Sequence, residues 1–190
     1  GGGGGAEAGT AGGTNIDAPG LRIATFNVAR FFNTSCDTGD CGSGAFEPVV
    51  SQADYDNKVA ALVAGVGTLD ADVLLLQEVE DQGCLDSVAA KLGGKYPTVL
   101  VAETGFAASV DVAVLARFPV IETRRHRQDP ISVEGGGSTT FTREFFEVRL
   151  SRDGVPVTLF VSHFRSKRDD DADRRRAEGI AARKIVLAAH

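Results

Sequence analysis

The order of apolar runs along the chain constrains its fold more than any other feature. A strand-like run at residues 21–28 precedes a helical stretch at 51–71, and the apolar run at 72–77 precedes a second helical stretch at 81–93. Five strand-like runs then follow one another, separated by Gly, Pro or polar turns, at 96–103, 109–118, 120–129, 139–150 and 155–164. Early alternation followed by consecutive strands predicts an α/β sandwich with two packed sheets.

The predicted helices carry recognisable start signals. Ser51 with Asp54 resembles a capping box before the first helix, and Asp81 is placed to cap the second. The first helix has an apolar stripe formed by Tyr55, Val59, Leu62, Val63 and Val66. A third helix is expected over 169–190, where acids precede arginines by four residues.

Length and composition indicate one folded domain with a tail. The chain has 190 residues, 43% of them hydrophobic, which suffices for a single core. Residues 1–20 are Gly-rich and predict a disordered linker or tail, leaving 21–190 as the folded part. No run reaches the roughly 18 apolar residues of a membrane span, so no span is expected. The first residue is Gly rather than Met, so we expect the natural start to lie upstream.

Charge is unevenly distributed along the chain. The net charge is −6, but residues 1–90 carry a net −10 and residues 91–190 a net +4. A basic half can indicate a polyanionic partner, but on this count alone uneven surface decoration is the favoured interpretation.

The three cysteines leave three pairings open. Cys36 and Cys41 bracket a short polar loop that a disulfide could close, and Cys84 could instead pair with either of them. A zinc site is not expected, because no fourth ligand stands at a familiar spacing. A disulfide would favour an oxidising compartment, so we expect a secreted protein.

Polar side chains interrupt or follow the apolar strands at four places. Asn27 interrupts the first strand, and Glu78 follows the second. His163 lies near the end of the last strand-like run, and Arg165 and Lys167 follow it within four residues. The segment "FTREFF" places Arg143 and Glu144 in another predicted strand. Each has an ordinary structural role when taken alone, such as a strand-end amide, an ion pair or a core histidine. The group of His163, Arg165 and Lys167 within five residues, however, indicates a site for a phosphate.

These segments, taken in order, resemble the endonuclease/exonuclease/phosphatase superfamily, whose fold is that of deoxyribonuclease I. The resemblance rests on "IATFNV", "DADVLLLQEVED", "VDVAVLARFPV", "REFFEVRL" and "VSHFRSK", and it covers about residues 21–190. "SHFRSK" and the Phe31–Phe32 pair are most similar to bacterial extracellular nucleases of this superfamily. The resemblance implies a four-layer α/β/β/α sandwich of the deoxyribonuclease I-like type.

The resemblance also implies roles for individual residues. Glu78 would be a ligand of a divalent cation, Mg²⁺ foremost, with Ca²⁺ or Mn²⁺ as alternatives. Asn27 would help to hold the metal, and His163 would stabilise charge at the scissile phosphate or assist proton transfer. Arg143, Arg165 and Lys167 would bind backbone phosphates. The implied reaction is attack of water on a phosphodiester.

The family pattern is incomplete in this chain. A Gly-Asp-x-Asn segment and a later Asp-His pair, which the family places downstream, are absent. The expectation is therefore the amino-terminal part of the domain, with the C-terminal half missing and with little or no activity alone. Glu80, two residues after the expected metal ligand, is expected to be solvated or to begin the next helix.

The substrate is left open among three readings. The leading one is a nuclease, with DNA favoured over RNA and no obligate protein partner. The alternatives are a phosphodiesterase or phosphatase acting on a lipid headgroup or small ester, and a non-catalytic module that binds phosphate. The expected location is extracellular, in a bacterium.

Overall fold

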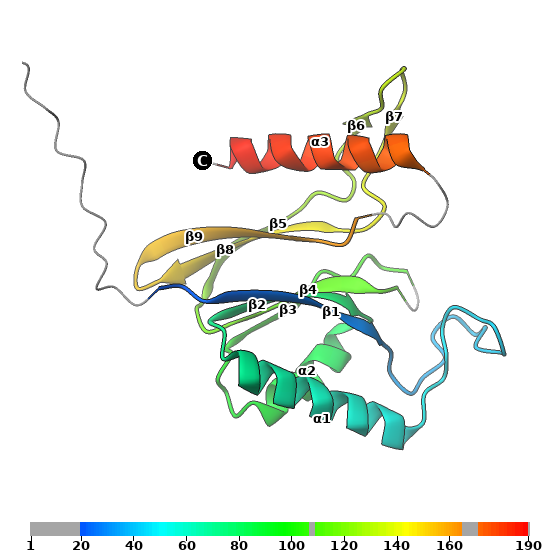
Figure 1. Cartoon of the computed structure of the whole chain (residues 1–190), viewed down its shortest axis with the longest axis vertical. Helices are drawn as coiled ribbons and strands as arrows, with labels where there is room; N and C mark the ends of the chain where they lie inside the picture. The colour runs from blue at the N-terminus through cyan, green and yellow to red at the C-terminus, as the bar shows by residue number, and fades with distance from the viewer. Residues whose placement is uncertain (1–19, 107–108, 165–170, 190) are drawn as a thin grey trace, which may run out of the picture.

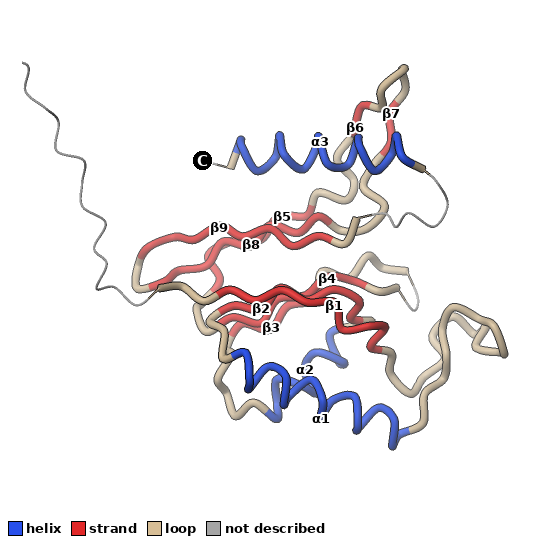
Figure 2. The backbone as a smooth tube through the Cα atoms, in the orientation of Figure 1, coloured by secondary structure: helices blue, strands red, loops and turns tan. Residues whose placement is uncertain are grey.

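The computed structural model describes residues 20–106, 109–164 and 171–189, and it arranges them in four layers (Figure 1). Two helices cover one sheet, a second sheet packs on the opposite face, and a third helix covers the second sheet (Figure 2). The predicted α/β/β/α sandwich is thereby confirmed. The predicted linker at 1–20 lies outside the described residues except for Gly20.

The first sheet contains the strand that leads into the acidic cluster of Glu78, Glu80 and Asp81. Its strands lie in the order β1-β2-β4-β3, with β1 and β2 parallel and the other pairs antiparallel. The bounds of its elements are β1 Ile23–Phe31, α1 Gln52–Leu69, β2 Val73–Val79, α2 Gln82–Lys91, β3 Thr98–Val101 and β4 Asp111–Ala116.

The second sheet is antiparallel, in the order β5-β8-β9. It is accompanied by a small hairpin and the last helix, and its elements are β5 Val120–Arg125, β6 Ile131–Ser132, β7 Ser138–Thr139, β8 Phe145–Arg152, β9 Val155–Ser162 and α3 Ala172–Ala188. Arg143 and Glu144 precede β8, so their predicted place within a strand is wrong. The Glu144 carboxylate instead accepts the backbone N–H groups of His126 and Arg127, at 2.8 and 2.9 Å.

Three buried clusters hold the layers together. Along β2 the side chains alternate, so that Leu74 and Leu76 face α1 and α2 while Val73 and Leu75 face the second sheet. Between the sheets, residues of β4 meet those of β8 and β9, including Val112, Val114, Phe146, Val148 and Val161. The cluster under α3 consists largely of aromatic and small side chains, including Phe141, Phe145, Ala177 and Ala182. Both faces of the first sheet are covered, which explains its nearly continuous apolar strands.

The predicted caps and one of the cysteine pairings are confirmed. Ser51 accepts the N–H of Asp54 at 3.1 Å, and Asp81 accepts that of Cys84 at 2.6 Å. Cys36 and Cys41 form a disulfide, and Cys84 is free and buried. None of the helices in the described part of the chain has the length and hydrophobicity that spanning a bilayer requires.

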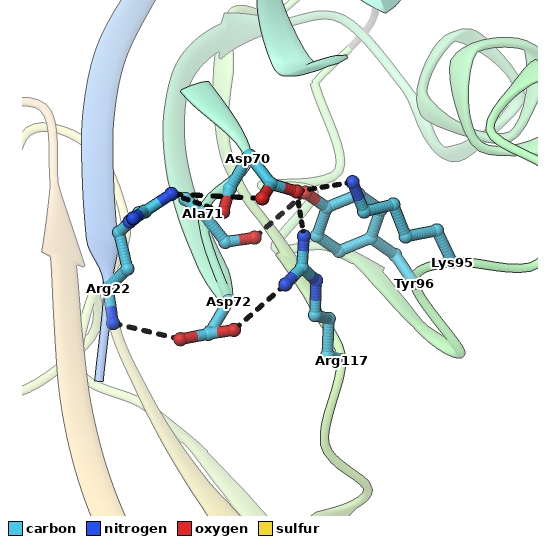
Figure 3. A network of polar contacts seen from close by, with 7 residues as sticks. All are labelled: Arg22, Asp70, Ala71, Asp72, Lys95, Tyr96 and Arg117. Carbon is cyan, nitrogen blue, oxygen red and sulfur yellow. Dashed lines mark hydrogen bonds and ion pairs between the residues drawn. The ribbon is translucent and has the colours of Figure 1, made fainter. Parts of the chain in front are cut away.

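A charged network joins the end of α1 to the edges of the sheet (Figure 3). Asp70 caps α1 in a left-handed conformation, with φ of 45°, and its carboxylate binds Lys95 and Arg117, each at 2.5 Å. The second nitrogen of Arg117 reaches Asp72 at 3.0 Å, and Asp72 also accepts the N–H of Arg22 at 2.9 Å. The network thus ties four chain segments together at the end of the first sheet that lies opposite Glu78.

This network predicts a stability difference that depends on pH. Hydrogen bonds from Lys95 and then Arg117 hold the pKa of Asp70 at about 2, below its ordinary 3.8. The folded chain therefore binds this proton less tightly than the unfolded chain, so the stabilisation is present above the ordinary pKa and is lost as pH falls toward the folded one. Asp70→Asn, which tolerates the left-handed conformation, is expected to lower the urea midpoint at neutral pH.

Urea unfolding at a series of pH values measures this effect. The difference between the natural chain and Asp70→Asn should be constant above about pH 5 and shrink below about pH 4. A difference that stays the same down to about pH 3 would contradict the assignment.

Candidate active site

The site lies where the parallel strands β1 and β2 end. Parallel pairing sets Asn27 beside Gln77, and the register then shifts before Phe31 pairs with Val79. Glu78 sits in this irregularity with φ of 68°, a left-handed conformation that costs a non-glycine residue of the order of 1 kcal/mol. Such bulges redirect a side chain out of the regular strand alternation. The bulge therefore explains how an apolar strand presents one carboxylate at its end.

Both oxygens of the Glu78 carboxylate are held by β1. The Asn27 side-chain amide donates to Oε1 at 2.7 Å, and the Arg30 backbone N–H donates to Oε2 at 2.9 Å. The amide oxygen of Asn27 in turn accepts the N–H of Ala29 at 2.8 Å. Ala29 and Arg30 both adopt left-handed conformations, with φ of 56° and 51°. The Ala29 N–H points toward Asn27, and the Arg30 N–H points toward Glu78. The carboxylate is thus positioned before any ligand arrives.

Glu78 is ionised at neutral pH. Partial burial by itself would raise its pKa, but the hydrogen bonds from Asn27 and Arg30 and the nearby His163 outweigh burial and lower the pKa. One fifth of the side chain remains exposed. An ionised carboxylate that is partly exposed to solvent can bind a cation.

The second sheet contributes His163, which directly follows β9. Its Nε2 lies 3.5 Å from Oε1 of Glu78, and its Nδ1 is buried without a hydrogen-bond partner among the described residues. Burial, followed by the charge of Arg143, lowers the pKa of His163 below its usual 6.5. The ring is therefore neutral at pH 7, with one nitrogen near the carboxylate. The sequence placed Asn27, Glu78 and His163 far apart, and the fold brings all three together.

Arg143 lies next to this group without contacting the acid. Its guanidinium donates to the backbone oxygens of His163 and Phe164, both at 3.4 Å. It also lines a pocket of about 210 Å³ together with Arg127 and the aromatic rings of Phe46 and Phe106. Arg143 is thus available both to support the histidine and to meet a ligand in the pocket.

Two predicted phosphate-binding residues, Arg165 and Lys167, lie outside the described residues. Two residues that the sequence analysis missed adjoin the site. Arg30 supplies its backbone N–H, and Lys58 on α1 donates to the carbonyl of Ala29 at 3.2 Å. Lys58 had no sequence signal, since a lysine on the polar side of a helix is ordinary.

Glu80 differs from its expectation. It is neither solvated nor part of α2, because it is only 4% exposed and its Oε2 accepts the N–H of Asn33 at 2.6 Å. Burial raises its pKa to about 7. The bulge at Glu78 and the end of β2 at Val79 break the alternation that would have placed both acids on one side. The acidic cluster thus separates into two environments.

The residues present fit a hard divalent cation. Glu78 offers an ionised carboxylate, and such cations accept one or two carboxylates, with water and substrate oxygens as the remaining ligands. Asn27 uses its amide hydrogen on Glu78 and its oxygen on Ala29, so in this geometry it orients the carboxylate.

Comparison with known proteins identifies the family and the fold of the chain. The endonuclease/exonuclease/phosphatase family model matches residues 24–188. No curated protein matches the chain by sequence. Among solved structures, a humanized TDP2 from D. rerio aligns with a TM-score of 0.54 and 16% identity, over 87% of this chain and 56% of that one.

Two further structures have the same fold. A protein of the endonuclease/exonuclease/phosphatase family from Leptotrichia buccalis aligns with a TM-score of 0.52 and 14% identity, over 86% of this chain and 63% of that one. D. rerio TDP2 complexed with a single-strand DNA product aligns with a TM-score of 0.50 and 16% identity, over 87% of this chain and 54% of that one. This chain thus spans little more than half the length of these structures. With its fold, its strand-end acid and a family match over most of its length, the chain belongs to the endonuclease/exonuclease/phosphatase family.

Proposed function

We propose that this chain is part of a metal-dependent phosphodiesterase that hydrolyses nucleic acid, with DNA as the favoured substrate. The observation that carries the proposal is the convergence of Glu78, Asn27 and His163 from two sheets. Family membership supports hydrolysis of phosphoric esters as the reaction class. The activity is proposed for the full-length protein, since this chain spans only part of its structural relatives.

The geometry supports distinct tasks for the three residues. A divalent cation, Mg²⁺ in our proposal, would polarise a phosphoryl oxygen when held by Glu78. Asn27 and the Arg30 N–H keep the carboxylate in place, so that little reorganisation is needed when charge develops. Neutral His163 can donate a hydrogen bond from Nε2 toward the phosphoryl oxygens. The neutral ring of His163 can also accept a proton, and the protonated ring can donate one.

Nucleic acid is favoured by the surroundings of the site. Arg143 and Arg127 line the pocket beside His163, and the Phe106 ring lies 4.7 Å from the Arg127 guanidinium carbon. Cationic groups bind phosphates, and exposed aromatic rings stack with bases. Arg165 and Lys167 belong to the same proposal as further phosphate ligands. The structural relative that holds a single-strand DNA product supports this substrate class.

A small phosphate ester or lipid headgroup is the alternative substrate, and a direct assay separates the two. The purified full-length protein should nick supercoiled plasmid in Mg²⁺, should lose this activity in EDTA, and should regain it when Mg²⁺ is restored. Release of phosphate or headgroup from model esters is measured in parallel. Ester cleavage with intact plasmid would overturn the nuclease proposal, and inactivity on both with metal bound would favour a binding module.

The disulfide supports a proposed location. Cys36 and Cys41 are paired in the loop after β1, and such bonds persist in oxidising compartments. We therefore propose that the protein acts outside the cytoplasm, as a secreted bacterial enzyme.

A further inference from the structure

A second group of carboxylates lies beneath the loop that connects β1 to α1. Glu47 and Glu80 are buried, at 1% and 4% exposure, and Asp37 lies at the surface above them. One carboxylate oxygen from each of the three lies within 4.8 Å of the others. Two of these acids come from the loop and one from the end of β2, so the group joins the loop to the first sheet.

The hydrogen bonds of this group leave one oxygen without a partner. Glu47 accepts the N–H groups of Asp37 and Thr38, at 2.6 and 2.9 Å, and the Thr38 hydroxyl at 2.5 Å. Oε2 of Glu80 accepts the N–H of Asn33, but its Oε1 is buried with no hydrogen-bond partner in the described chain. A buried carboxylate oxygen left unpaired is costly. Either a bound cation or a proton on Glu80 would remove this cost.

The charged side chains that line the adjoining pocket are all acidic. Among the residues that the structure describes, no lysine or arginine forms an ion pair with Asp37, Glu47 or Glu80. Asp37 and Glu80 line a pocket of about 220 Å³ that Asp81 and Glu103 also line. This volume accommodates an ion with several waters, since one water occupies about 30 Å³ in the liquid.

We propose that Asp37, Glu47 and Glu80 form a second cation site, specific for Ca²⁺ and separate from Glu78. Ca²⁺ binds carboxylate oxygens at about 2.3–2.6 Å in irregular geometry, so oxygens on opposite sides of one ion are about 4.8 Å apart. The observed spacing lets a single ion contact all three acids. Mg²⁺ requires shorter bonds and near-octahedral geometry, which three acids from a loop and a strand end satisfy less readily.

The site would order the loop beside the active site. Phe46 precedes Glu47 directly, and its ring packs edge-on against Phe32 at 5.9 Å and under the Arg30 guanidinium at 4.7 Å. Phe46 also lines the pocket that contains Arg143. Ca²⁺ bound at Glu47 would therefore hold this wall of the pocket in place.

Calorimetric titration of the full-length protein with CaCl₂ tests the proposal. The natural protein and Glu78→Gln should both retain one high-affinity Ca²⁺ site. Asp37→Asn and Glu80→Gln should raise the Kd of that site by at least about 10-fold, because even the loss of a group that only supports a metal ligand typically costs about 10- to 100-fold in affinity. Asp40→Asn, an exposed acid of the same loop outside the group, is the matched control and should leave the Kd unchanged.

Limited proteolysis gives an independent readout. CaCl₂ should slow cleavage between residues 33 and 47 in the natural protein and in Glu78→Gln, but not in Asp37→Asn. If Glu80→Gln fails to fold, Asp37→Asn still tests the proposal, because Asp37 is exposed. The proposal is overturned if Asp37→Asn binds Ca²⁺ like the natural protein, or if Ca²⁺ binding disappears with Glu78→Gln alone. It is also overturned if the natural protein binds no Ca²⁺, in which case a proton on Glu80 satisfies the buried oxygen.

Discussion

Glu78→Gln is expected to lower metal-dependent phosphodiester hydrolysis by the full-length protein by about 10³-fold or more. Glutamine keeps the size of the side chain but removes the charge that a divalent cation requires. Its amide oxygen can accept from Asn27 or from the Arg30 N–H but not from both, because its NH2 group only donates, so we expect the variant to fold with reduced stability. Initial rates of plasmid nicking across a range of Mg²⁺ concentrations measure the effect.

A matched control separates charge loss at the site from charge loss in general. Glu122 on β5 is exposed and pairs only locally with Arg124 among the described residues, so Glu122→Gln should retain full activity. Thermal unfolding of both variants shows whether they fold. If Glu78→Gln keeps activity within tenfold of the natural protein while folded, the metal-ligand assignment is wrong.

His163→Ala is expected to lower kcat by about 10²- to 10⁴-fold, the usual contribution of a positioned acid–base or hydrogen-bonding group. The affinity for Mg²⁺ should change much less, because His163 approaches the carboxylate at 3.5 Å without being part of its hydrogen bonding to β1. Single-turnover rates and Mg²⁺ titrations of the same preparation distinguish the two quantities.

The conservative variant identifies what the histidine does. His163→Gln keeps a side-chain N–H donor but cannot transfer a proton near neutral pH. Recovery of most activity would assign His163 to charge stabilisation, and activity as low as in His163→Ala would assign it to proton transfer. Unchanged kcat in His163→Ala would remove it from the catalytic group.

The layers of the fold could be predicted because periodicity reports burial directly. The stripe that includes Val59 and Val66 lies against the first sheet, and the apolar run of β2 is covered on both faces. The caps at Ser51 and Asp81 were predictable for a similar reason, since a cap is a local hydrogen bond between residues three apart. The short β6–β7 hairpin was not predicted, because each of its strands has only two residues.

The two halves of the acidic cluster show what local pattern cannot resolve. Regular strand alternation places Glu78 and Glu80 on one side, yet the bulge sends Glu78 toward Asn27 and leaves Glu80 buried beside Asn33. The bulge lies opposite the left-handed residues Ala29 and Arg30 of the neighbouring strand, where the register of β1 and β2 shifts. No pattern within residues 70–81 contains that information.

The order of the longer strands and helices and the positions of the caps can be predicted from the sequence, because both depend on residues close together in the chain. The grouping of Asn27 with Glu78 and His163, and of Asp37 with Glu47 and Glu80, becomes visible only in the folded chain. Each group combines residues from segments far apart in the sequence. Their distances are set by strand register, sheet packing and one bulge, which are properties of the whole fold.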